Sequence, residues 1–153
     1  MLGVRTAGVE EEKALLALLD LSFTPYVRAL GREVTPVAYQ RLSDALARGD
    51  VRVAIEGDAI LGFASLVPHG DALEVDLLAV APEAQRRGIG RILLDDAEAR
   101  ARAAGLARLE LHTAAMFGHL LRLYASAGYR ETHRGLPSHG ADAFERVYFE
   151  KRL

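Results

Sequence analysis

Arginine and glycine residues gather in one short segment, the run QRRGIGR from Gln85 to Arg91. Glycine has no Cβ, so the backbone at Gly88 and Gly90 can adopt unusual dihedral angles and come close to a ligand. Where such a run opens a helix, the free N–H groups of the first turn and the positive end of the helix dipole attract anions. The arginines add charged donors. The segment therefore predicts a cradle for phosphate oxygens, and the alternative is a helix start with incidental glycines.

Other phosphate and metal motifs are missing from the sequence. There is no G-x-x-x-x-G-K-[ST], which leaves a nucleotide triphosphatase loop without support. No G-x-G-x-x-G follows the first predicted strand, which argues against a dinucleotide-binding fold. The chain has no cysteine, so disulfides, cysteine zinc sites and a cysteine nucleophile are excluded. Its five histidines have no metal-ligand spacing with carboxylates, and the sequence predicts no metal site.

Strands and helices on both sides must position the arginine-glycine run. Leu73 to Val80 is apolar along most of its length, as is typical of a strand at the centre of a sheet, and Gly90 to Ala104 has the apolar stripe of an amphipathic helix. A break is expected near Pro25, because proline lacks a backbone donor. Apolar patterning predicts further strands over residues 4–7, 51–55, 60–67, 106–113, 129–134 and 143–153, and helices over residues 9–21, 22–30, 35–48 and 117–127.

Length and charge narrow the class of protein. The chain has 153 residues, enough for one domain, and is 50% hydrophobic and 26% charged, which is typical of a soluble globular protein. The net charge of −2 provides no bulk attraction to nucleic acid or to a membrane surface. No apolar run reaches the roughly 18 residues of a membrane span, and the acidic start lacks a secretory signal. A cytoplasmic location is therefore expected. The abundance of Ala and Arg is typical of a GC-rich, bacterial-like coding bias.

Two motifs resemble one enzyme family. The letters QRRGIG at 85–90 match the Q/R-x-x-G-x-G/A pyrophosphate loop of the GNAT N-acetyltransferase superfamily, and LYASAGY at 123–129 matches its later L-Y-x-x-x-G-F/Y segment. The flanking LAVAP at 78–82 and the pair Leu93-Leu94 also resemble it. The resemblance implies a single GNAT domain over residues 1–153. Its fold class would be α/β (α+β), with a central mixed, mostly antiparallel sheet of six or seven strands flanked by about four helices.

The resemblance also implies a co-substrate, acetyl-CoA. Amides of the loop would hold its pyrophosphate, and backbone groups at the end of the preceding strand would lie along the pantetheine arm. The residues so assigned to CoA are Leu78, Ala79, Val80, Gln85, Arg86, Arg87, Gly88, Ile89, Gly90, Arg91 and Tyr124. The sequence departs from the family at Phe117, where an asparagine that contacts the cofactor is usual. This departure bears on how CoA is positioned and leaves the fold prediction as it is.

The implied reaction is direct attack of an amine on the acetyl thioester, which requires two proton transfers. Tyr124 matches the tyrosine that often serves the family as the acid toward sulfur, and a phenol with its ordinary pKa of about 10 is protonated at neutral pH. The alternative is a tyrosine that packs under the cofactor. Glu74 and Asp76 share one face of a strand. Each is a candidate base or a contact for a cationic substrate, while a solvated carboxylate or a chain of waters is the alternative.

The acceptor implied by the resemblance is a primary amine of a small molecule, peptide or protein. Tyr26, Glu74 and His139 are the predicted substrate contacts, and the other histidines are expected to be surface or packing residues. A non-catalytic acyl-CoA-binding sensor is a second hypothesis, favoured by the missing asparagine. Acetylation of aminoacyl-tRNA is a third, against which the net charge argues. By analogy with the family, the chain would form a homodimer.

Overall fold

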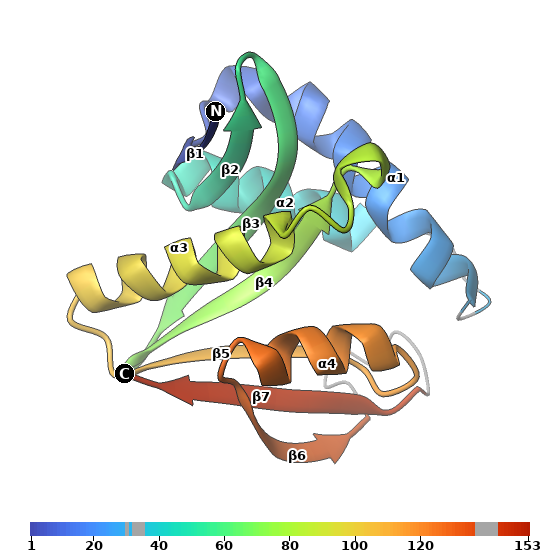
Figure 1. The fold of residues 1–153 in the computed structure, drawn as a ribbon, viewed down its shortest axis with the longest axis vertical. Helices are drawn as coiled ribbons and strands as arrows, with labels where there is room; N and C mark the ends of the chain where they lie inside the picture. Colours follow the sequence, from blue (N-terminus) through green and yellow to red (C-terminus); the bar gives the residue numbers. More distant parts are fainter. Residues whose placement is uncertain (30, 32–35, 137–143) are drawn as a thin grey trace.

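A computed structural model describes residues 1–29, 31, 36–136 and 144–153. These residues form one seven-stranded sheet in the order β1-β2-β3-β4-β5-β7-β6 (Figure 1). The strands are β1 (Leu2–Thr6), β2 (Val51–Glu56), β3 (Ala59–His69), β4 (Ala72–Val80), β5 (Arg108–Ala114), β6 (Arg130–Gly135) and β7 (Arg146–Arg152). The helices in these ranges are α1 (Glu12–Ala29), α2 (Pro36–Arg48), α3 (Ile89–Ala103) and α4 (Gly118–Ser126), with short 3-10 turns at Val9–Glu11 and Pro82–Ala84.

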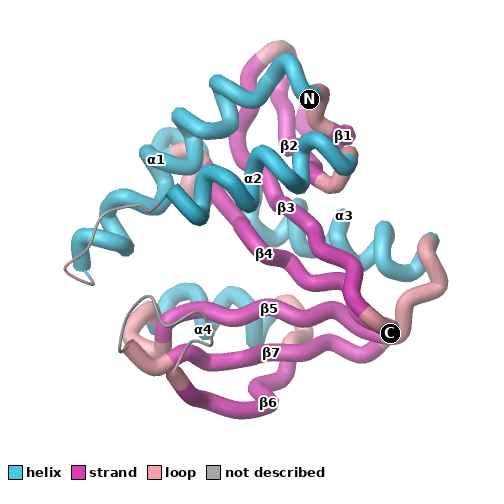
Figure 2. The backbone as a smooth tube through the Cα atoms, turned by 180° about the vertical axis from the view of Figure 1, so that it is seen from behind, coloured by secondary structure: helices cyan, strands magenta, loops and turns pink. Residues whose placement is uncertain are grey.

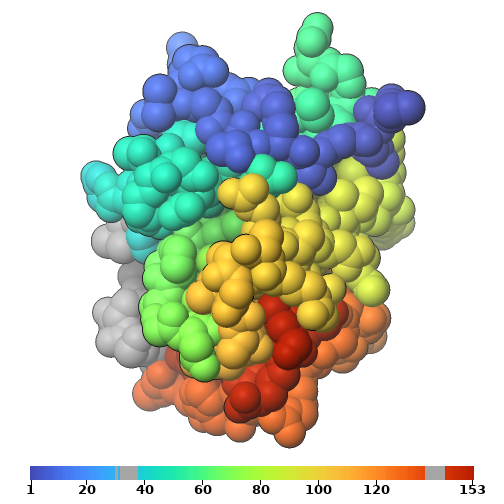
Figure 3. Space-filling model, turned by 90° about the vertical axis from the view of Figure 1, so that its left-hand side faces the viewer, coloured from blue at the N-terminus to red at the C-terminus, as the bar shows by residue number. Residues whose placement is uncertain are grey.

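The helices cover the sheet from both sides. Seen from behind, α1 and α2 lie in front of β2, β3 and β4, while α3 and α4 lie on the opposite face (Figure 2). In the space-filling view, α3 runs across the middle of the molecule, below α1 and α2 and above the C-terminal strands (Figure 3). Buried side chains from all these layers form one hydrophobic core, which includes Leu15, Leu42, Phe63, Leu93 and Leu109. This is the mixed α/β architecture that the sequence predicted.

Adjacent strands of the sheet are antiparallel except β4 and β5, which are parallel and are joined through α3. Their pairing is short. Only Ala72–Glu74 on β4 pairs with Arg108–Glu110 on β5, and beyond these residues the two strands separate (Figure 1). The separation divides the molecule into a half built on β1–β4 and a half built on β5–β7, with an opening between them.

A β-bulge lies in β4 at the start of this opening. Ser65 of β3 pairs with Leu77, whereas the next residue of β3, Leu66, pairs with Val75, so Asp76 is the extra residue. The Leu77 amide donates to the buried Ser65 hydroxyl, with an N–Oγ distance of 3.1 Å, instead of to a carbonyl. Because a bulge bends its strand and increases the local twist, this one turns β4 away from β5.

Three details of the sequence-based elements are corrected. Residues 9–30, expected to break near Pro25, form the continuous helix α1 through Ala29. Pro25 lies on the exposed side of α1, where the missing backbone donor is tolerated because the opposite side packs into the core. The turn expected at 68–70 starts later, since β3 extends through His69. The sequence also left open that β7 lies between β5 and β6.

A partly buried ion pair fastens α3 to the first half of the sheet. Arg52 of β2 donates to both carboxylate oxygens of Asp96 on α3, at 2.8 and 3.0 Å, and also to the Thr6 hydroxyl at 2.7 Å. Only 13% of the Arg52 side chain and 16% of the Asp96 side chain are exposed. The neighbouring Asp95 pairs with Arg91 instead, at the surface, with 58% of its side chain exposed.

Replacing Asp96 with alanine is therefore expected to destabilise the protein by about 3 kcal/mol, because it leaves the Arg52 charge partly buried and unpaired. For a chain of this size, that lowers Tm by roughly 6–12 °C. Asp95→Ala is the matched control, since it makes the same change of side chain on the same helix and removes only a surface pair that contributes less than about 1 kcal/mol. Thermal unfolding of both variants checks this, and equal shifts would contradict it.

Candidate active site

The opening between β4 and β5 contains a cavity of about 800 Å³. Both halves of the molecule contribute to its wall. Its polar and aromatic lining residues are Ser22, Phe23, Tyr26, Arg41, Asp76, Gln85, Arg86, Arg91, His112, Thr113, Phe117, His119, Tyr124 and Arg146. The apolar lining includes Val75, Leu77, Leu78, Val80, Ile89, Leu111, Leu120 and Leu123, with Gly88 and Gly90. A long apolar channel with polar groups along it is the usual form of a site for an extended ligand.

The arginine-glycine run forms one rim of this cavity. Its backbone is left-handed at Arg86, with φ of 68°, and at Gly88, with φ of 79°. Gly88 is the N-cap of α3, and no side chain caps the helix. The first helical bond runs from the Ile92 amide to the Gly88 carbonyl, so the amides of 89–91 have no partner within the helix. This is the anion cradle that the glycine spacing predicted.

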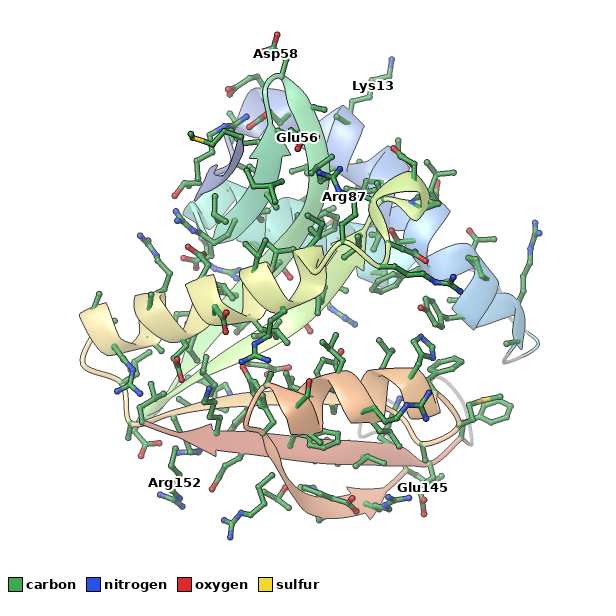
Figure 4. All side chains as sticks on the ribbon, viewed as in Figure 1. Lys13, Glu56, Asp58, Arg87, Glu145 and Arg152 are labelled. Atoms are coloured by element: carbon green, nitrogen blue, oxygen red, sulfur yellow. The ribbon has the colours of Figure 1, made fainter. Side chains whose placement is uncertain are left out.

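The three arginines of the run have different partners. The Arg91 guanidinium contacts Asp95 at 3.1 Å and donates to the Ser126 carbonyl of α4 at 3.2 Å, so it links α3 to the second half of the molecule. Arg87 points away from the cavity, toward Glu56 of β2, with 2.8 Å between nitrogen and oxygen (Figure 4). Arg86 lines the cavity. A left-handed backbone costs a residue other than glycine about 1–2 kcal/mol, which marks Arg86 as a functional candidate.

The backbone of β4 presents hydrogen-bonding groups to the cavity. The Leu77 amide donates toward β3, to Ser65, and the Ala81 amide donates to the Leu61 carbonyl. Because backbone groups alternate in direction along a strand, those of Leu78 and Val80 point into the opening. The Val80 carbonyl already accepts from the Ser22 hydroxyl at 2.8 Å. Leu78 is therefore the position at which an amide-containing ligand can pair with β4.

Tyr124 lies on α4 with its ring packed edge-on against Phe149 of β7, at a centroid distance of 5.6 Å. It is 6% exposed, and it lines the cavity. Burial raises the pKa of its phenol well above the ordinary value, and the nearby Tyr26 raises this pKa further. The phenol therefore stays protonated through the neutral range, as a hydrogen-bond donor requires.

The two candidate carboxylates differ in their surroundings. Asp76 lines the cavity and accepts from the Arg41 guanidinium of α2 at 3.0 Å. Glu74 is not among the cavity residues and lies 3.6 Å from His69, whose ring also contacts Glu110 at 2.9 Å. Burial raises the pKa of Glu74, and the Asp76 carboxylate raises it further. Of the two, only Asp76 faces the space in which a substrate would lie.

Aromatic side chains bridge the two halves at the other end of the cavity. The Tyr26 hydroxyl of α1 lies 3.0 Å from the His119 Nε2 atom of α4, and the two rings stack. Tyr26 also meets Phe117 edge-on at 4.8 Å. Phe117, which stands where the resembling family has asparagine, thus faces the cavity and contacts the predicted substrate residue Tyr26.

Most of the residues predicted from the sequence meet at this cavity. Besides Glu74, Ala79 and Arg87 do not line it, and the predicted substrate contact His139 lies outside the described residues. Residues missed from the sequence are Ser22, Arg41 and the histidines His112 and His119, which were expected to be surface or packing residues. Their contribution depends on strand and helix pairings that join distant segments, and a local motif carries no sign of these. No metal-ligand cluster and no helix able to span a membrane occurs among the described residues.

Solved structures with the same fold cover the whole chain. A polyamine N-acetyltransferase of Drosophila melanogaster, which forms N-acetylagmatine, has a TM-score of 0.82 at 16% identity, covering 100% of both chains. The ribosomal-protein-S18-alanine N-acetyltransferase of Escherichia coli has a TM-score of 0.80 at 17% identity, covering 100% of this chain and 94% of its own. The PaiA N-acetyltransferase of Thermoplasma acidophilum, solved with coenzyme A, has 0.79 at 16%, covering 100% and 99%. At such identities the likeness concerns the fold.

The sequence itself identifies the family. No curated protein matches the chain significantly. The model of the acetyltransferase (GNAT) family matches residues 15–129, which include both β4 and the arginine-glycine run and end at Tyr129. Together with the splayed parallel strands and the anion cradle, this confirms the family that the two motifs resembled: the chain belongs to the GNAT acetyltransferase family.

Proposed function

We propose that this protein transfers the acetyl group of acetyl-CoA to a primary amine by direct attack within a ternary complex. The observation that supports this most strongly is the combination, in one cavity, of an anion cradle at Arg86–Arg91, an unpaired strand edge at Leu78 and a buried phenol at Tyr124. The cradle fits a pyrophosphate, the strand edge fits the amides of a pantetheine arm, and the phenol fits the sulfur. Residues 1–153 would act as one domain.

Tyr124 would donate its hydrogen bond to the sulfur as the C–S bond breaks and negative charge develops there. Burial disfavours the phenolate, because a buried charge is poorly solvated. Full proton transfer to sulfur is therefore expected only as a proton from the amine nitrogen replaces the one that Tyr124 gives up. This couples release of the thiol to formation of the amide.

The acceptor is proposed to be an amine of a small molecule, a peptide or a protein. Two of the structural relatives act on agmatine or on the alanine of a ribosomal protein, and both classes of amine deserve testing here. A cytoplasmic location and a homodimer are proposed with it. The sensor hypothesis rests on Phe117, and it differs from the enzyme hypothesis in requiring no turnover.

Binding of acetyl-CoA should raise Tm, whereas pantetheine, which lacks the phosphates, should raise it far less. At a ligand concentration about 100-fold above Kd, the added stability is roughly 2.7 kcal/mol, which corresponds to about 5–11 °C for a chain of this size. A thermal shift assay measures both. Equal shifts for the two ligands would contradict the pyrophosphate cradle.

Arg86→Gln should weaken acetyl-CoA binding about tenfold, because it removes a charged donor at the cradle. Arg100→Gln removes the same charge from an exposed position farther along α3 and should leave Kd within about twofold. Calorimetric titration of both variants gives the comparison, and equal affinities would mean that Arg86 does not contact the phosphates.

Tyr124→Phe should lower kcat by about 100-fold while leaving the Kd of acetyl-CoA nearly unchanged, because it removes only the donor to sulfur. Tyr129→Phe is the matched control. Tyr129 is also a buried tyrosine of the second motif, but it does not line the cavity and its hydroxyl has no partner among the described residues. That variant should keep full turnover and gain about 1 kcal/mol of stability. Detection of released thiol measures both rates, and full turnover of Tyr124→Phe would exclude the acid role.

A further inference from the structure

His112 lies on β5, two residues beyond the point where β5 and β4 stop pairing. The last pair of the register joins Glu110 to Glu74, and His69 contacts both carboxylates, so these two side chains lie on the same face of the sheet. Because alternate residues of a strand share a face, His112 lies on the face of Glu110. It lines the cavity together with Asp76, which follows Glu74 by two residues on the other strand. His112 and Asp76 thus stand on opposite sides of the opening.

The face that His112 shares with Arg41 and Asp76 is the one covered by α1 and α2 (Figure 2). Tyr124 belongs to α4, on the other face, and its ring packs against the side of β7 that carries Phe149. A thioester held in the opening would therefore meet the phenol from one face of the sheet and an incoming amine from the other. This is the geometry that direct attack requires, with the nucleophile and the leaving sulfur on different sides of the carbonyl carbon.

Of the titratable side chains at this face, His112 is the best suited to accept a proton. Asp76 is held by the Arg41 guanidinium, and Glu74 does not line the cavity. His119 lines the cavity but is exposed, and its Nε2 atom is bonded to the Tyr26 hydroxyl. The His112 ring is half-buried and stacks on Tyr148 of β7 at 5.2 Å. An imidazole ordinarily titrates near pH 6.5, which suits a base that works near neutral pH.

We propose that His112 is the general base that removes the proton from the acceptor ammonium, an inference that rests on the proposed acetyl transfer. The ammonium gives one proton to the imidazole, which later releases it to water. The neutral amine then attacks the carbonyl carbon, so that a C–N bond forms and the C–S bond breaks. The second nitrogen proton restores Tyr124 as the phenol gives its own proton to sulfur. The products are the N-acetyl amide, CoA thiol and one proton in solution.

Several groups surround His112 and set its titration. Glu110 precedes it on the same face of β5, Asp76 and Arg41 lie across the opening, and Arg146 of β7 lines the same cavity. Tyr148 stacks on its ring, and His133 of β6 stacks on Tyr148 as well, at 4.3 Å. His133 does not line the cavity. The two histidines therefore share one tyrosine partner, but only His112 can reach a substrate.

The test compares His112→Gln with His133→Gln in the whole protein. The acceptor is whichever of agmatine, spermidine, ethylamine and a peptide with N-terminal alanine the wild type acetylates fastest. His112→Gln should lower kcat/KM for that acceptor about 100-fold. It should also abolish the ionisation near pH 6.5 in the pH profile, leaving a rate that rises with the fraction of neutral amine. His133→Gln should keep both the rate and the ionisation. Acetyl-CoA should raise the Tm of both variants as it does for wild type.

A second variant covers a glutamine that perturbs the fold. His112→Ala leaves space for a small base, so added imidazole should restore part of its activity. The proposal is overturned if His112→Gln stays within about threefold of wild type. It is also overturned if both histidine variants lose activity equally, or if His112→Gln loses activity but keeps the ionisation near pH 6.5. A wild type that binds acetyl-CoA but acetylates none of the four amines would contradict the proposed acetyl transfer itself, and with it the base.

Discussion

The short parallel pairing of β4 with β5 is the constraint on which the rest of the molecule depends. Three residue pairs hold the strands together at one end, and the bulge at Asp76 then bends β4 away. If the pairing continued, the groups of Leu78 would be consumed by β5 and no cavity would exist. Because it stops, an unpaired strand edge is left inside the protein, a state that is costly unless a ligand or water pairs with it. The opening is therefore a built-in demand for an extended, amide-containing ligand.

The cavity is also electrically graded along its length. One rim has the amides of the α3 N-terminus and Arg86, which favour negative charge. The acceptor side has Asp76, whose charge is balanced by Arg41, so it does not repel an incoming cation. Between them lies the buried phenol of Tyr124, which is kept neutral by its raised pKa. An anionic donor and a cationic acceptor are thus each matched to one end, with a neutral, low-dielectric region where the acetyl group would pass between them.

The fold class and the anion cradle could be predicted from local patterns, because apolar periodicity and the Gly88-x-Gly90 spacing act over a few residues. Near Pro25 the local pattern was misleading. Proline predicts a break, but packing of the other side of α1 into the core decides the outcome. The acceptor side was predicted least well. Whether Glu74 or Asp76 faces the cavity depends on a bulge set by Ser65 of another strand, and His112 enters the site only through the β4–β5 register, so neither is encoded near the residue concerned.

The position of β7 between β5 and β6 also bears on how the protein acquires its site. β6 hydrogen-bonds only to β7 among the described strands, although β7 comes later in the sequence. During folding, β6 therefore has no place in the sheet until β7 has inserted beside β5. The same insertion supplies Phe149 beneath Tyr124 and Tyr148 beside His112. Cofactor cradle and crossover helix can form earlier, from contiguous chain, whereas both proposed proton-transfer groups gain their supports in a single late step. A nascent chain lacking β7 would then hold the phosphate-binding loop without a competent reaction centre, which delays chemistry until synthesis has passed this strand.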